Sequence, residues 1–149
     1  MVALSPLAAC QPQTADTNVE RAVGGLEQAP LTIRGVDGKT HVFTVEIARS
    51  EAEQEQGLMN RQSIAPDKGM IFPLAPVREA SFWMKNTLIP LDLIFVRGDG
   101  TIARIEENAV PLNLQPILSG EPVAAVLEIA GGRSAQLGIK AGDRVSWKG

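Results

Sequence analysis

Residues 81–96, SFWMKNTLIPLDLIFV, decide the fold class of this chain. The segment begins with apolar residues, passes through the polar residues 85–87 and Pro90, and ends in the apolar run 91–96. Two apolar stretches separated by a polar, proline-bearing turn indicate two strands. Asp92 interrupts the second stretch, and both faces of that strand are otherwise apolar, so we expect Asp92 to be buried.

The same pattern of strands and turns continues outward from this segment. Residues 41–48 alternate apolar and polar side chains, and an Asp-Gly turn before them predicts a hairpin with residues 31–34. The Arg-Gly-Asp-Gly sequence at residues 97–100 predicts a second hairpin. Residues 107–121 contain two Pro and two Asn and are expected to form a long loop.

Two short helices interrupt the strands. Ser50 and Glu53 have the spacing of a capping box, and Gly57 is placed to end the helix that the box begins. A second short helix is expected just before Gly138. With seven or eight short strands, this pattern predicts a mainly β domain over residues 31–149. We expect a single antiparallel sandwich or a partly open barrel of jelly-roll type.

Composition excludes several classes of protein. The chain has 149 residues, of which 44% are hydrophobic, and its net charge of −3 offers no basic surface for nucleic acid. One Cys and one His are too few for a structural zinc site or a disulfide framework. No apolar run approaches the roughly 18–20 residues that a membrane-spanning helix needs. We therefore expect no metal and no cofactor.

The N-terminal residues 1–30 are expected to be a remnant of a targeting signal followed by a disordered tether. The sequence Leu-Ala-Ala-Cys ends at Cys10 and resembles a bacterial lipobox, in which the Cys is cleaved and lipidated. Residues 1–9 lack the positive charge and apolar length of a complete signal peptide, so we expect them to be a remnant of one. This predicts an exported, periplasm-facing protein that contacts an envelope membrane only through a lipid on Cys10.

Four ordered motifs resemble a known family. The domain of unknown function 192 family of prokaryotic proteins is similar to this chain over residues 40–147, through GLMNRQSI (57–64), GMIFPL (69–74), FWMKNTLIPLDLIFV (82–96) and VLEIAGGRSAQLGIKAGDRV (126–145). The resemblance implies a compact β fold, often carried behind a signal or lipid anchor. It implies no activity, because the family has none established. The shared pattern maps onto Gly57, Leu58, Met59, Arg61, Gly69, Met70, Phe72, Phe82, Trp83, Met84, Lys85, Asn86, Thr87, Pro90, Asp92, Glu128, Gly131, Gly142 and Asp143.

Two buried carboxylates are the candidates for chemistry. Asp92 and Glu128 both lie in apolar runs, where an ionised carboxylate needs a cation or backbone N–H groups, or a raised pKa. One interpretation gathers them with Lys85 and Asn86 in a polar pocket beside Trp83. The other is structural: Asn86 and Thr87 cap a turn, Asp92 accepts N–H groups in that turn, and Glu128 pairs with Arg61.

Three functions remain open. The first is a non-enzymatic module that binds a small molecule or an envelope polymer through Arg61, Trp83, Lys85, Asn86, Thr87, Asp92 and Glu128. The second is an envelope hydrolase that uses Asp92 and Glu128 with Lys85. The third is a Cu(I) site built from Met59, Met70 and Met84 beside Trp83, although packing alone also accounts for these Met residues. No nucleophile elbow, phosphate loop or dinucleotide motif is present, so we favour the binding module.

Overall fold

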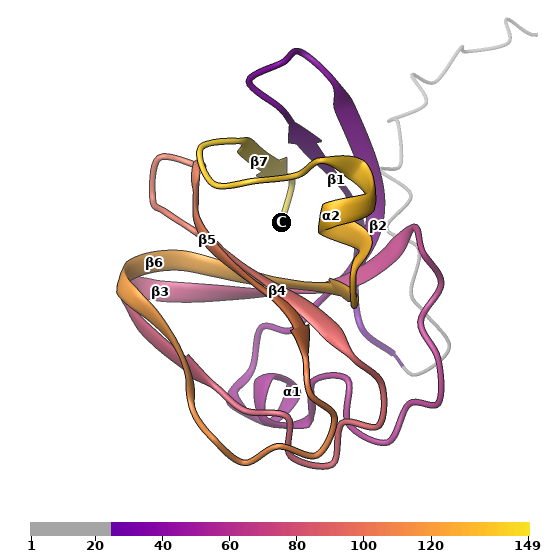
Figure 1. The fold of residues 1–149 in the computed structure, drawn as a ribbon. Helices are drawn as coiled ribbons and strands as arrows, with labels where there is room; N and C mark the ends of the chain where they lie inside the picture. The colour runs from indigo at the N-terminus through magenta and orange to yellow at the C-terminus, as the bar shows by residue number, and fades with distance from the viewer. Residues whose placement is uncertain (1–24) are drawn as a thin grey trace, which may run out of the picture.

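The structure, a computed structural model, describes residues 25–149, and the predicted lipidation site Cys10 lies outside the described residues. The described part contains seven strands and two short helices (Figure 1). The strands are β1 (Gln28–Arg34), β2 (Thr40–Ile47), β3 (Lys68–Phe82), β4 (Leu91–Val96), β5 (Ile102–Ala109), β6 (Ile117–Ala130) and β7 (Arg144–Trp147). The helices are α1 (Glu51–Gln56) and α2 (Arg133–Leu137). The predicted mainly β fold with two short helices is confirmed.

The seven strands form one sheet that curls into a half-barrel. Their order is β5-β4-β6-β3-β2-β1-β7, and every pair is antiparallel except β2 with β3, which is parallel. An isolated bridge between Thr101 and Arg144 brings the start of β5 against β7, so the two ends of the strand order meet at one point. Of the two predicted architectures, the partly open barrel is the one that forms.

Two strands are longer than the sequence predicts. The strand predicted to begin at Ser81 is the end of a longer strand, β3, which starts at Lys68 and shifts register against β6 between Pro73 and Arg78. β6 begins at Ile117, inside the expected loop, and leaves a connection of residues 110–116. The paired far arms of β3 and β6 extend the sheet beyond the barrel, toward the end that carries α1 (Figure 1).

Apolar side chains fill both faces of the central strands. One cluster lies on the face that includes Ile94 and Leu127, and it also takes in residues from β1, β2 and β7. The second lies on the opposite face, with Leu93, Phe95 and Val126, and packs under the segment that contains α1. Consequently all six residues of β4 are buried, as the apolar run 91–96 predicts.

Local polar contacts set the boundaries of the elements. The capping box of α1 forms as predicted: the Ser50 hydroxyl accepts the Glu53 N–H, and the Glu53 carboxylate accepts the Ser50 N–H.

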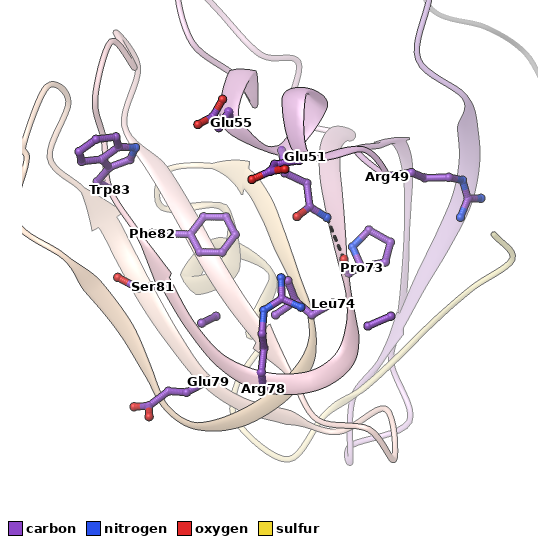
Figure 2. Close-up of a pocket in the computed structure, with 13 residues that line it drawn as sticks. Arg49, Glu51, Glu55, Pro73, Leu74, Arg78, Glu79, Ser81, Phe82 and Trp83 are labelled. Carbon is purple, nitrogen blue, oxygen red and sulfur yellow. Dashed lines mark hydrogen bonds between the residues drawn. The ribbon is translucent and has the colours of Figure 1, made fainter.

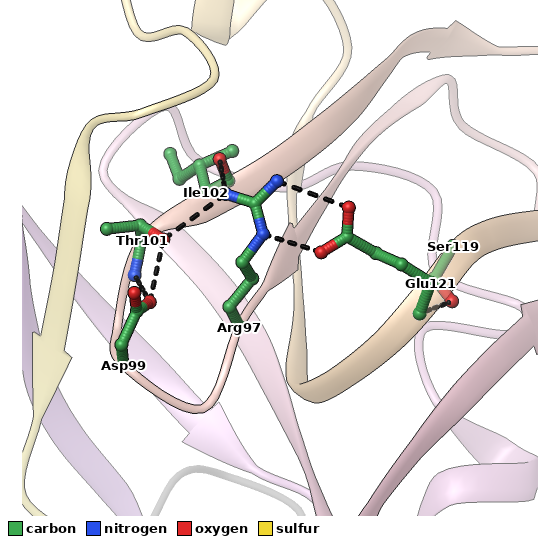
Figure 3. Close-up of polar contacts among 6 residues, drawn as sticks. All are labelled: Arg97, Asp99, Thr101, Ile102, Ser119 and Glu121. Atoms are coloured by element: carbon green, nitrogen blue, oxygen red, sulfur yellow. Dashed lines mark hydrogen bonds and ion pairs between the residues drawn. The ribbon is translucent and has the colours of Figure 1, made fainter.

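An ion pair joins the β4–β5 hairpin to β6. Arg97 donates two hydrogen bonds to Glu121, which fastens the hairpin to that strand (Figure 3). The Arg97 contact holds the pKa of the Glu121 carboxyl below its usual value.

Candidate functional site

A groove lies between α1 and the bent strand β3. Its volume is about 690 Å³, and its walls come from α1, the bend of β3 and the end of that strand. Figure 2 shows Phe82 pointing into this space from β3, with Glu51 and Glu55 of α1 on the other side. Trp83 lies at its rim and is half exposed. The groove therefore combines an aromatic wall with carboxylates that face solvent.

A smaller hollow adjoins the groove, and we call it the Glu128 pocket. Its volume is about 40 Å³, and it shares Gln54, Glu55, Phe82 and Trp83 with the groove. The remaining lining residues are Gln56, Gly57, Leu58, Met59, Phe72, Thr87 and Glu128. This volume exceeds the space that one water molecule needs, so the pocket admits a small group at the end of a larger ligand.

Glu128 is a buried carboxyl residue that lines this pocket. It is 5% exposed, and within residues 25–149 its carboxyl oxygens have no hydrogen-bond or ion-pair partner. Burial alone raises the pKa of Glu128 from 4.5 to about 8, because desolvation disfavours the ionised form. Glu128 therefore carries a proton at neutral pH.

Arg61 does not neutralise Glu128. Its guanidinium forms a bidentate pair with Glu46 of β2, at 2.5 and 3.1 Å, so the predicted Arg61–Glu128 pair is wrong. Strand register explains the arrangement, because Glu46 lies opposite Met70, and Met70 lies opposite Glu128. Directly opposed residues share a face, so the two carboxylates flank Met70 in one row. Among residues 25–149, Glu46 therefore has a cation partner and Glu128 has none.

Asp92 lies on the other face of the sheet. It is fully buried, and its carboxylate accepts the backbone N–H groups of Asn108, Gly132 and Ser134 at 2.8–2.9 Å. Two of these donors lie at the start of α2, so Asp92 caps that helix from β4. The predicted acceptance of N–H groups is found, but the donors are not in the turn after Lys85. Asp92 therefore does not converge with Glu128.

Of the polar residues 85–87, Thr87 is the one that lines the pocket. The Thr87 hydroxyl donates to the Lys85 carbonyl at 3.1 Å within a turn over residues 84–87. The Lys85 ammonium lies 5.0 Å from the centre of the Trp83 ring, a cation–π contact. Asn86 is exposed, has a positive φ of 52°, and holds the loop after α1 by accepting the Asn60 N–H. Lys85 and Asn86 are outside the lining of the Glu128 pocket.

Of the three Met residues of the predicted Cu(I) site, two are buried in the apolar core and one lines the Glu128 pocket. Met70 and Met84 are buried in the apolar cluster beneath α1, where they fill space. Met59 lines the Glu128 pocket, and its sulfur is 4.0 Å from the Asn86 amide nitrogen. In residues 25–149 no three His, Cys, Asp or Glu side chains gather as metal ligands. No helix in that part of the chain has the length and apolar character to cross a membrane.

Sequence reasoning missed several residues of the site. Glu46 is one of the polar residues of the alternating segment 41–48, yet it is buried and paired with Arg61. Phe82 and Phe72 form an edge-to-face pair, with ring centres 5.2 Å apart, in the wall of the pocket. Both residues lie in the motifs that resemble the family, and this resemblance was the sequence feature that pointed to them. Apart from their place in a capped helix, nothing in the sequence marked Glu51 and Glu55 as residues of a site.

Comparisons with known proteins agree with this fold. The family model DUF192, described as "Uncharacterized ACR, COG1430", matches residues 32–147. A solved structure of a protein of unknown function from Novosphingobium aromaticivorans DSM 12444 is 46% identical, with a TM-score of 0.82, over 93% of this chain and 100% of that one. A proposed transcription regulator from Sinorhizobium meliloti 1021 is 44% identical, with a TM-score of 0.80, over 82% of this chain and 95% of that one. A search of curated proteins found no match.

Proposed function

This chain belongs to the DUF192 family, whose members are uncharacterised, and we propose that it acts as a non-enzymatic binding module. Its ligand, a small molecule or a segment of an envelope polymer, lies in the groove beneath α1 and places one group in the Glu128 pocket. Trp83 and Phe82 supply the apolar contact area, as aromatic side chains do in ligand sites.

The observation that carries this proposal is the Glu128 carboxyl, which has no hydrogen-bond or ion-pair partner among residues 25–149. Buried side chains with polar groups almost always have such a partner. The Glu128 side chain lines an open pocket, where a ligand can supply the missing partner. Nearby Glu46, buried in the same row, has a partner from the chain itself.

The motifs of the family gather around the same pocket. Of its eleven lining residues, eight fall within the four motifs that carry the family resemblance: Gly57, Leu58, Met59, Phe72, Phe82, Trp83, Thr87 and Glu128. Only four of the thirteen residues that line the larger groove do so. This difference supports a role for the Glu128 pocket beyond packing.

A hydrolase with two carboxylates receives no support from the geometry. Glycosidase mechanisms need both carboxyl groups beside one scissile bond, about 5–10 Å apart on the same ligand. Asp92 and Glu128 project from opposite faces of the sheet, and Asp92 is enclosed by backbone N–H groups. We therefore base the proposal on binding alone.

Export and lipid attachment belong to the same proposal. The lipobox-like residues 7–10 support tethering of the domain to an envelope membrane through Cys10. Expression of the gene with its natural upstream region in a bacterial host, with a labelled fatty acid, tests this. We expect label on the wild-type protein and none on Cys10→Ala. Equal labelling, or label on neither, would contradict it.

Binding is tested through the fluorescence of Trp83. The chain has two Trp residues, so Trp147→Phe leaves Trp83 as its only Trp. Titration of this variant with soluble peptidoglycan fragments is expected to change the emission in a saturable manner. Amide chemical shifts of residues 54–59 should move with the same midpoint. Val42→Ala, on an exposed site of β2, serves as the control that leaves binding unchanged. Absence of both signals would refute the proposed function.

A further inference from the structure

We propose that the Glu128 pocket receives a primary ammonium group at the end of the ligand's chain, with Glu128 as its counter-ion. This inference rests on the proposed function, and it names the chemical class of the group that the pocket holds. Three features of the described residues lead to it: the missing partner of Glu128, the aromatic wall of the pocket, and the charge of the groove.

The first feature is that no basic side chain among residues 25–149 pairs with Glu128. Of the basic side chains near this face, Arg61 is held by Glu46, and Lys85 lies over Trp83. A buried carboxyl gains most from a partner that allows it to ionise, since a charge-assisted hydrogen bond is about twice as strong as a neutral one. An ammonium group has three donors and no acceptor, and therefore complements a carboxylate.

The second feature is the aromatic wall. Phe72, Phe82 and Trp83 line the pocket together, and aromatic rings attract a cation through their negative faces. The Lys85 ammonium already lies 5.0 Å from the centre of the Trp83 ring and would repel a second cation there, so Phe72 and Phe82 are the rings left to a ligand ammonium. A ligand ammonium beside these two rings would be stabilised by them as well as by Glu128.

The third feature is the charge of the groove that leads to the pocket. Glu51, Glu55 and Glu79 line the groove, and none of them has a hydrogen-bond or ion-pair partner among the described residues. Of its two Arg residues, Arg49 is paired with Glu27, and Arg78 is exposed. Unpaired carboxylates along a cleft raise the local concentration of cations. The groove therefore favours a positively charged ligand.

The hydrogen-bond donors that Glu128 requires select the kind of ammonium. A volume of about 40 Å³ accommodates a primary ammonium, which is close to water in size. A trimethylated ammonium carries three more methyl groups in place of its hydrogens, and it offers no N–H donor to Glu128. We therefore expect an unbranched primary amine, such as the end of a lysine-like side chain.

The test compares three small probes of similar length by NMR titration near neutral pH. These are n-butylamine, its neutral relative N-butylacetamide, and butyltrimethylammonium. We expect n-butylamine to shift the amide signals of residues 54–59 and to move the Glu128 carboxyl carbon to its ionised position. The other two probes should bind at least about tenfold more weakly, since one lacks the charge and the other lacks the donors. Glu128→Gln should weaken amine binding by at least about tenfold, while Glu46→Gln, the same change in the same row, should retain it.

Equal binding of the amine and the amide would overturn the inference. So would unchanged affinity in Glu128→Gln, a Glu128 carboxyl that stays protonated when the amine is bound, or failure of n-butylamine to bind. In each of these cases, binding of peptidoglycan fragments by the wild-type protein would leave the proposed function standing. Loss of that binding as well would remove both.

Discussion

Replacing Glu128 with Gln is expected to make the protein more stable in a pH-dependent manner. The pKa of Glu128 is about 8 in the folded protein and close to 4.5 in an unfolded chain. Below pH 4.5 the carboxyl is protonated in both states, so it adds no pH dependence. Between the two values only the unfolded chain loses the proton, which favours unfolding. The free energy of unfolding therefore falls as pH rises, and it stays at its lower level above pH 8.

The size of the effect follows from the two pKa values. Each pH unit between them changes the free energy of unfolding by about 1.4 kcal/mol, so the full interval is worth up to about 5 kcal/mol. Gln has nearly the same shape as a protonated Glu and does not ionise. Near pH 4.5 the two proteins should thus have similar stability, and near pH 8 the Glu128→Gln protein should be the more stable one by several kcal/mol.

Urea unfolding at a series of pH values measures this difference directly. The remaining titratable groups are common to both proteins, so their contributions cancel when the two free energies are subtracted. Glu107→Gln, a change at an exposed residue of β5, is the matched control and should show no such trend. A difference between wild type and Glu128→Gln that stays constant with pH would refute the claim that Glu128 is protonated in the folded protein.

Three further substitutions test the framework of the site. Asp92→Ala removes the acceptor of three backbone N–H groups, so the free energy of unfolding measured in urea should fall by about 3–5 kcal/mol and hydrogen exchange in α2 should become faster. A loss under about 1 kcal/mol would contradict the capping role of Asp92. Arg61→Gln leaves buried Glu46 without its cation and should lower the free energy of unfolding by about 1–2 kcal/mol, a modest loss because Arg61 is partly exposed. Adding Glu46→Gln should restore much of that stability, and a double variant with no recovery would argue against the ion pair. Gly57→Ala forces a side chain into a positive φ of 45° and should lower stability by about 1–2 kcal/mol in thermal unfolding, whereas an unchanged Tm would show that the backbone there relaxes.

Local signals in the sequence predicted the elements well. The Ser50–Glu53 capping box, the hairpin turns and the alternation of strand residues depend on neighbours within a few positions, and these elements form as expected. The parallel pairing of β2 with β3 was not predicted, because it joins strands across α1 and depends on the whole sheet. The continuity of β3 was also missed, since Pro73 and Pro76 suggested breaks rather than a bend in one strand.

The candidate site was predicted only in part, because it depends on register between distant strands. Alternation correctly placed Asp92 and Glu128 on apolar faces, but it did not say that these faces lie on opposite sides of the sheet. That relation is fixed by the pairing of Leu93 with Glu128. The choice between Glu46 and Glu128 as the partner of Arg61 depends on the path of the loop after α1, which no local pattern specifies.

The closing of the half-barrel also limits which strand edges another chain can pair with. β7 is only four residues long, pairs with β1 on one side, and meets β5 at the Thr101–Arg144 bridge on the other. The outer edge of β5 carries Arg104, Glu106 and Glu107, and charged side chains on an edge discourage a further strand from adding to it. Copies of the domain are therefore poorly suited to join through this edge into fibrils. Beyond their pairing with β2 and β4, the far arms of β3 and β6 keep open edges, where Pro73, Pro76 and Pro122 supply no N–H donors for main-chain pairing with a peptide.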